Sequence, residues 1–193
     1  MSDKDQTGIH PLLTVVAAIV IFVAIVGGYV WFNNKPPADA GQVLSVSAYP
    51  IHRELSTGSA LGGISGGANI YDELIVIADV RISSKTNVPT SLFEIWGDVT
   101  LDNGDSQRSL AANNTDYHKV FIAYPDLASQ QKTPLPRGAT IAPGQQIEGQ
   151  LIFHYPISKQ QWDQKKTFDI DIEFTHEKDL VLHVTGGGSG TSK

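Results

Sequence analysis

One short stretch of the chain has the residue types of a serine nucleophile. Residues 63–67, GISGG, match the pattern G-x-S-x-G, in which the serine is held on a sharp turn between a strand and a helix. Around Ser65 a glycine-rich loop comes first and a strand-forming run follows, so neither supporting element is in place. We therefore interpret Gly58 to Gly67 as a flexible loop, assign no catalytic residue and expect a protein that is not an enzyme.

Three carboxylates, Asp169, Asp171 and Glu173, alternate with large apolar residues in the run TFDIDIEF. On a strand they share one face, and there they are candidate calcium ligands. Calcium sites usually take their oxygens from loops that wrap around the ion, and we expect His183 to lie opposite Asp171 on the neighbouring strand. A solvated sheet face therefore explains these carboxylates more simply than a metal site.

No other cofactor class has a motif in the chain. There is no cysteine, which excludes disulfides, thiolate metal sites and cysteine nucleophiles. No phosphate-binding glycine motif followed by Lys-Ser/Thr is present. The histidines show neither H-x-x-x-H nor H-x-x-E-H spacing, which leaves only a zinc site assembled by tertiary folding; they are His10, His52, His118, His154, His176 and His183. We expect no cofactor.

The charge of the chain argues against nucleic acid as a partner. The formal net charge is −6 at pH 7, and no basic stripe interrupts this acidic balance. A domain of this sign is repelled by a phosphate backbone, and broad adhesion to anionic lipid surfaces is disfavoured for the same reason.

An uncharged run of 22 residues, Pro11 to Phe32, places the protein at a membrane. As a helix it would extend ~33 Å, enough to cross a hydrocarbon core of ~30 Å. Tyr29, Trp31 and Phe32 at its end are suited to the membrane interface. Ala24 and Gly28 form a small-xxx-small pair, which favours close helix packing but also arises by chance in such a composition.

The segments on either side of this run suggest a topology. The flanking charges are too few to fix the orientation, but a short tail before a first hydrophobic segment and a large domain after it favour residues 1–10 in the cytoplasm and the domain outside. Cleavage after Ala40 is the rival interpretation, because residues 38–40 have the A-x-A form, although the run is longer than the core of a signal peptide. Residues 33–41, NNKPPADAG, have the composition of a linker.

The rest of the chain predicts one all-β domain, residues 42–185. Alternating apolar residues predict strands at 42–48, 71–82, 92–101, 107–111, 146–156, 167–174 and 180–184. Short helices are expected at 116–124, capped by Asn114 or Thr115, and after Ser158. The last hairpin should pair Phe174 with Leu180, Ile172 with Leu182 and Ile170 with Val184. This pattern favours an antiparallel β-sandwich of immunoglobulin-like type. Residues 186–193, GGGSGTSK, look like a flexible tail or an expression remnant without fold information.

Four aromatic residues are candidates for a surface that binds a protein partner. Tyr117, Phe121 and Tyr124 follow helical spacing in the predicted helix, and Trp162 lies on the short turn after Ser158. If they gather at one end of the domain they would form a partner patch. Packing in the core is the other use for them.

The order of turns and strands between residues 75 and 184 resembles uncharacterised bacterial proteins that have an N-terminal membrane anchor and one immunoglobulin-like domain. The resemblance rests on the strand and turn at 75–89, the turn at 102–105, a short aromatic helix that ends at Pro125, and the runs APG, GQLIF and YP at 142–144, 149–153 and 155–156. The same layout is similar, more loosely, to late-embryogenesis-abundant type-2 domains. The resemblance implies the fold and the tethering, and it supplies no catalytic residue.

Taken together, these features predict a single-pass, membrane-anchored β-sandwich that serves as a non-enzymatic interaction or scaffold domain outside the cytoplasm, in the periplasm if the cell has two membranes. The lipid bilayer is its partner through residues 11–32, and we expect a protein partner in a membrane complex. The alternative is an extracytoplasmic sensor of a ligand or of calcium.

Overall fold

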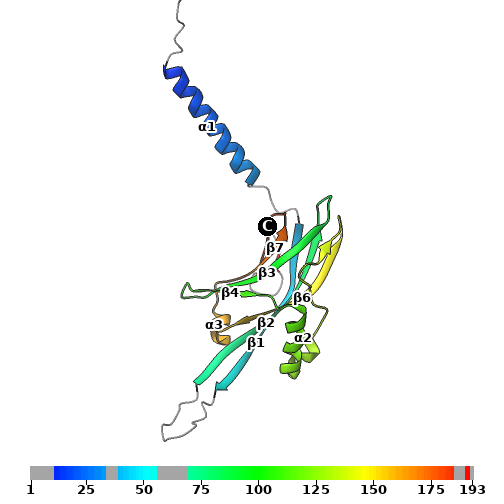
Figure 1. Ribbon diagram of the computed structural model, residues 1–193. Helices are drawn as coiled ribbons and strands as arrows, with labels where there is room; N and C mark the ends of the chain where they lie inside the picture. The colour runs from blue at the N-terminus through cyan, green and yellow to red at the C-terminus, as the bar shows by residue number, and fades with distance from the viewer. Residues whose placement is uncertain (1–10, 34–38, 56–68, 185–189, 192–193) are drawn as a thin grey trace, which may run out of the picture. The chain divides into compact units, whose positions relative to one another are not determined.

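The computed structural model describes residues 11–33, 39–55, 69–184 and 190–191 (Figure 1). The chain divides into two compact units, residues 1–36 and 37–193. The first contains helix α1, Pro11–Asn33, which is the predicted apolar run and one further residue. The second contains strands in two sheets and three short helices among its described residues.

The elements of the second unit follow in this order: β1 (Asp39–Leu55), β2 (Asn69–Ser84), β3 (Thr90–Thr100), β4 (Ser106–Leu110), α2 (Asn114–Ala123), the 3₁₀ helix η1 (Pro125–Gln130), β5 (Thr140–Ile141), β6 (Gln146–Tyr155), α3 (Lys159–Asp163), β7 (Thr167–Thr175), β8 (Leu180–His183) and β9 (Gly190–Thr191).

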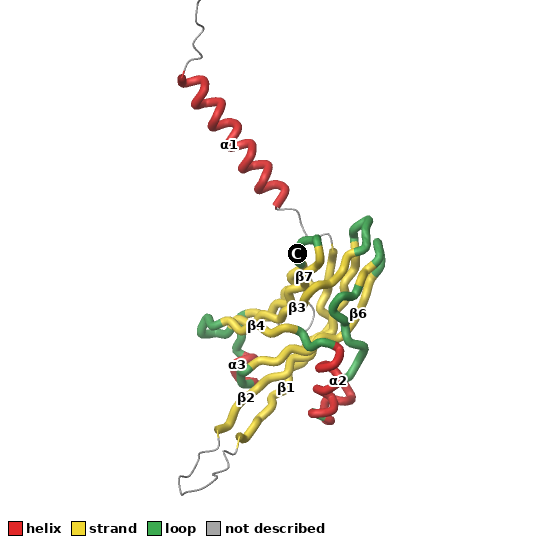
Figure 2. The backbone as a smooth tube through the Cα atoms, in the orientation of Figure 1, coloured by secondary structure: helices red, strands yellow, loops and turns green. Residues whose placement is uncertain are grey.

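The strands form two antiparallel sheets, which confirms the prediction of an all-β domain with short helical inserts. The first sheet has the order β6-β2-β1-β9, and the second has the order β4-β3-β7-β8, with β5 paired to β3. One buried core contains apolar residues of both sheets, among them Val76 of β2, Phe153 of β6 and Phe168 of β7. Figure 2 shows the strands of both sheets and α2 near β6.

Strand β2 is buried on both of its faces. Alternate side chains point to opposite faces of a strand, so Val76, Ala78 and Val80 enter the core shared by the sheets. Ile75 and Ile77 point the other way, into a second cluster with residues of α2. A strand covered on both sides needs a nearly continuous apolar run, and LIVIADV is such a run.

The helix starts are set by side-chain caps. Asn113, rather than Asn114 or Thr115, caps α2, because its extended backbone lets its side-chain oxygen accept from Asp116 N at 2.9 Å. The predicted cap at Ser158 is confirmed. Its hydroxyl accepts from Gln161 N while the Gln161 side chain accepts from Ser158 N, which satisfies two otherwise free donors.

Strands extend past both predicted boundaries of the β domain. Strand β1 begins at Asp39 inside the predicted linker, because residues 39–41 pair with Ser84, Ser83 and Ile82. A cut after Ala40 would remove the first two residues of this ladder. At the other end, the predicted tail contributes β9, whose Gly190 and Thr191 pair with Val43 and Gln42 of β1.

Strand β1 is also much longer than predicted, 17 residues instead of 7. It continues through Pro50, which lies opposite Leu74 of β2. Proline lacks an N–H and is tolerated where a strand faces no second partner. Among the described residues, the other side of β1 pairs with β9 at Gln42 and Val43 alone, so Pro50 can sit in an edge strand.

The last hairpin has a different register from the predicted one. Ile172 lies opposite Leu180, and Ile170 lies opposite Leu182. His183 is consequently opposite Asp169 and not Asp171. The shift is two residues, so every side chain keeps its predicted face, and alternation alone does not distinguish the two registers.

Candidate functional site

The surface of α1 is apolar on all sides. Between Thr14 and Trp31 the mean hydropathy is 2.4 and no residue is buried. The large apolar side chains of this stretch are 42–76% exposed. In the part of the chain that the structure describes, this is the one helix long and apolar enough to cross a membrane.

The predicted interface and packing residues of α1 keep their positions on this helix. Tyr29 and Trp31 are exposed near its C-terminal end, while the side chain of Phe32 lies outside the described part. Ala24 and Gly28 are separated by one helical turn, and nothing lies within 4 Å of the place that a Cβ on Gly28 would take. Interface binding and helix packing both stay predictions.

The three candidate calcium ligands are held by other side chains of the second sheet. Arg108 of β4 donates to Asp171 Oδ2 at 3.1 Å and lies 3.6 Å from Glu173 Oε1. Asp169 Oδ1 is 2.8 Å from His183 Nδ1. Within the described ranges, no group of three or more His, Cys, Asp or Glu side chains is arranged to hold a metal ion. The calcium prediction therefore gains no support from this face.

Burial affects the pKa of Asp171 more strongly than Arg108 does. Its partial burial raises the pKa of that carboxyl, the nearby Asp179 raises it further, and Arg108 opposes both. The guanidinium of Arg108 also lies over the ring of Trp96, 4.7 Å from its centroid. Arg108 thus bridges the strands of this face.

The four aromatic candidates do not form one patch. Tyr117 and Phe121 are buried in the cluster beneath α2, with Tyr124 packed against it. Trp162 belongs instead to the core shared by the sheets, where its ring centroid lies 5.0 Å from that of Phe168. Core packing is the role that the structure gives to Tyr117, Phe121 and Trp162. The serine of the G-x-S-x-G pattern, Ser65, lies outside the described residues.

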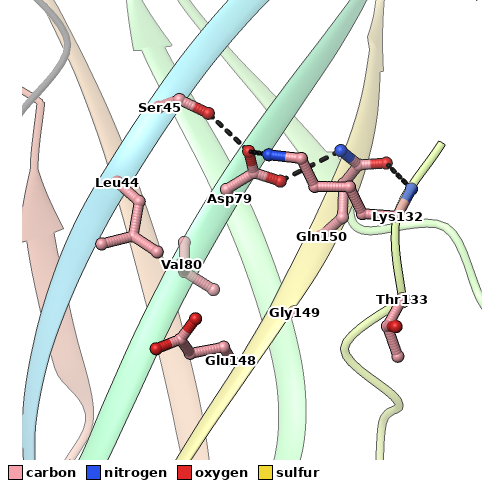
Figure 3. Close-up of a pocket in the computed structure, with 9 residues that line it drawn as sticks. All are labelled: Leu44, Ser45, Asp79, Val80, Lys132, Thr133, Glu148, Gly149 and Gln150. Atoms are coloured by element: carbon pink, nitrogen blue, oxygen red, sulfur yellow. Dashed lines mark hydrogen bonds and ion pairs between the residues drawn. The ribbon is translucent and has the colours of Figure 1, made fainter. Parts of the chain in front are cut away.

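A polar cleft that the sequence did not indicate crosses the outer face of the first sheet (Figure 3). Its volume is about 400 Å³. Strands β1, β2 and β6 form its floor, and the segment after η1 forms one wall. The lining residues are Leu44, Ser45, Asp79, Val80, Lys132, Thr133, Glu148, Gly149 and Gln150.

Asp79 is the centre of this cleft and is only 8% exposed. Three side chains from three different segments donate to it (Figure 3). Ser45 Oγ and Lys132 Nζ each lie 2.6 Å from Oδ2, and Gln150 Nε2 lies 3.0 Å from Oδ1. A buried carboxylate requires such compensation, because it has lost its water.

The donors keep Asp79 ionised. Burial acts most strongly and by itself raises the pKa of Asp79, but the hydrogen bonds from Lys132, Ser45 and Gln150 together with the positive charge of Lys132 outweigh it, and the pKa is lowered below its ordinary value of 3.8. At neutral pH the cleft therefore contains a buried negative charge whose principal counterion is Lys132.

A second layer of hydrogen bonds fixes Gln150. The Tyr117 hydroxyl lies 2.7 Å from Gln150 Oε1 and also 2.7 Å from the carbonyl oxygen of Lys132, so its single hydrogen can reach either acceptor. Burial raises the pKa of Tyr117, and the negative charge of Asp79 adds to the effect. The phenol stays neutral and links α2, β6 and the cleft wall.

Gly149 is expected to be essential for the wall of the cleft. A Cβ at this position would lie 2.6–2.7 Å from the backbone and Cβ of Leu135, which donates through its N–H to the Gln150 carbonyl at 3.0 Å. We predict that Gly149→Ala costs about 1–3 kcal/mol, as overpacking usually does. Urea denaturation checks this value. Gln146→Ala, an exposed position on the same strand, is the matched control, and an equal effect of both variants would contradict the prediction.

Comparisons with known proteins do not assign the chain to a family. No family model matches the chain, and no curated protein matches it. It is similar to the X-ray structure of a Northeast Structural Genomics Consortium target, with 9% identity, a TM-score of 0.31 and coverage of 77% of this chain and 83% of that one. It is also similar to a conserved hypothetical protein from Bacillus anthracis, with 11% identity, a TM-score of 0.29 and coverage of 70% and 97%. Similarity of this degree carries no argument about the chain.

Proposed function

We propose that the protein is a single-pass, membrane-anchored domain of immunoglobulin-like type that acts outside the cytoplasm as a non-enzymatic interaction or scaffold module. The observation that supports this most is α1. Its large side chains are exposed around the whole circumference. Apolar surface of this extent requires a cover, and a lone helix of this length satisfies its own backbone inside a bilayer.

The anchoring is tested by comparing the full chain with a chain that lacks residues 11–33, each expressed in a bacterial cell. We expect the full chain to stay in the membrane fraction after extraction with sodium carbonate and the shortened chain to be soluble. The intact mass of the protein in both fractions distinguishes an anchor from a cleaved leader, because cleavage would remove residues 1–40 and α1 with them. A soluble full-length chain would refute the proposal.

The orientation can be read by thiol labelling, because the natural chain has no cysteine. Ser106→Cys places a single thiol at an exposed position of β4, and Ser2→Cys places one in the N-terminal tail. A maleimide that cannot cross membranes should label the first variant in intact cells and the second only after lysis. The opposite pattern would exclude an extracytoplasmic domain.

The interaction role is tested by extraction in a mild, uncharged detergent followed by mass measurement of the native species. We expect a species heavier than one chain with its detergent, since an accessory subunit stays with its partner under such conditions. A monomer under all extraction conditions would count against this role.

A ligand sensor is the second candidate function. The observation that favours it is the cleft around Asp79, which combines a volume of about 400 Å³ with a buried charge. Ligand pockets often place a few convergent polar groups in this way.

A further inference from the structure

Asp79 accepts hydrogen bonds from two donors on neighbouring strands and from one on a connecting segment. Ser45 belongs to β1 and Gln150 to β6, and both strands are paired to β2, which carries Asp79. These two donors are held in place by the sheet. Lys132 comes from the segment after η1 and reaches Asp79 through a long side chain.

Exposure separates the two members of the ion pair. The side chain of Lys132 is 63% exposed, whereas that of Asp79 is 11% exposed. The ammonium therefore approaches the buried carboxylate from the open side of the cleft. If it leaves, Asp79 keeps two neutral donors and lacks a cation, which is unfavourable for a buried charge. The position that Lys132 Nζ occupies is thus suited to bind a primary ammonium group.

A second carboxylate faces the same cleft. In the register of β2 and β6, Gln150 lies opposite Asp79 and Glu148 lies opposite Arg81. Asp79 and Glu148 are therefore diagonal neighbours on paired strands, a relation in which two residues lie ~7 Å apart. Arg81 Nε pairs with Glu148 Oε1 at 2.5 Å, and about half of the Glu148 side chain stays exposed. Among the lining residues two are acidic and one is basic. Each carboxylate has one basic partner, Lys132 for Asp79 and Arg81 for Glu148, so a cationic ligand has to displace a side chain at Asp79 and share Glu148 with Arg81.

We propose that this cleft binds a linear aliphatic diamine, one ammonium of which takes the place of Lys132 Nζ on Asp79 while the other extends toward Glu148. A primary ammonium has three donors, as many as Lys132 presents. Leu44, at the irregularity in the β1 ladder, gives the aliphatic chain an apolar contact at the rim. The inference does not depend on membrane anchoring.

Lys132 is then a tethered competitor of the ligand. A site that is already occupied for most of the time binds a ligand more weakly, in proportion to its free fraction. Removing the competitor should strengthen binding, whereas a purely structural Lys132 would leave no site behind. A change of affinity in Lys132→Ala therefore distinguishes a competitor of the ligand from a purely structural lysine.

The experiment uses the full chain in micelles of an uncharged detergent, with putrescine as the probe. Lys132→Ala should lower the melting temperature, and putrescine should restore part of the loss. Calorimetry should show that Lys132→Ala binds putrescine roughly tenfold more tightly than the natural chain does, because the competitor is gone. Lys119→Ala is the matched control, since Lys119 forms an exposed ion pair with Asp116 at 3.0 Å.

Three further measurements decide the outcome. Tetramethylammonium at equal ionic strength has no N–H donor and should restore nothing. The double variant Asp79→Asn with Lys132→Ala should bind no putrescine. Putrescine should bind more tightly than butylamine, which has only one ammonium group. Glu148→Gln leaves the hydrogen bonds of Asp79 intact and should make the two affinities equal. Rescue by tetramethylammonium, rescue that persists without the Asp79 carboxylate, or a failure of putrescine to raise the melting temperature of Lys132→Ala would each overturn the proposal.

Discussion

The variant Trp162→Ala is expected to lose about 3–5 kcal/mol of folding free energy, the usual cost of removing a large aromatic side chain from a core. The indole is buried in the core shared by the two sheets. Its centroid lies 5.0 Å from that of Phe168 and 6.2 Å from that of Tyr155. The cavity left by alanine would therefore open between strands of both sheets.

Urea denaturation of the full chain in detergent, followed through the β-sheet signal, measures this loss. The matched control is Ile122→Ala on α2, because Ile122 is apolar but 78% exposed and should change stability by at most about 0.5 kcal/mol. If Trp162 instead belonged to a surface for a partner, Trp162→Ala would leave stability nearly unchanged and would weaken assembly. A loss below about 1 kcal/mol would show that the core assignment is wrong.

Local sequence patterns were sufficient to locate the main strands and to assign the faces of their side chains. The run around Val76 predicted a strand because β-branched residues fit a pleated, buried surface, and Ser158 with Gln161 predicted a helix start because two side chains satisfy two free donors. The register of β7 and β8 was missed because the same faces result when His183 pairs with Asp169 or with Asp171.

The cleft could not be predicted, because its chemistry joins segments far apart in the sequence. Lys132 is 53 positions from Asp79, and Gln150 is 71 positions from it. No spacing rule connects residues at such separations. One signal was available: Asp79 is a charged residue inside the strongly apolar run LIVIADVRI, and a charge in a strand buried on both faces requires partners from elsewhere.

Removal of Lys132 should reverse the sign of the effect that ionisation of Asp79 has on the stability of the folded state. In the natural chain the pKa of Asp79 is lowered from 3.8 despite its burial, through Lys132, Ser45 and Gln150. A carboxyl whose folded pKa is depressed contributes stability above its unfolded pKa and loses that contribution as the pH falls through the folded pKa. The Asp79 contribution is therefore constant between pH 7 and about pH 5.

In Lys132→Ala the strongest lowering influence is gone and burial remains. We expect the pKa of Asp79 to rise above its ordinary value, so that the folded state prefers the protonated carboxyl. The variant should be about 1–3 kcal/mol less stable at pH 7, the usual cost of taking a donor from a buried acceptor, because only Asp79 of the pair is buried and Ser45 and Gln150 still donate to it. This deficit should shrink as the pH falls, since protonation removes the uncompensated charge.

Denaturation of both chains at several pH values between 7 and 4 measures the deficit, and titrations common to the two chains cancel in the difference. The double variant Asp79→Asn with Lys132→Ala has no carboxyl at position 79. Its deficit should be independent of pH between pH 7 and about pH 5, the range in which the contribution of Asp79 to the natural chain is constant. A deficit in Lys132→Ala that stays constant or grows on acidification would contradict the prediction, because Asp79 would then have another counterion. A shrinking deficit confined to the single variant would identify Lys132 as the cation that keeps Asp79 charged.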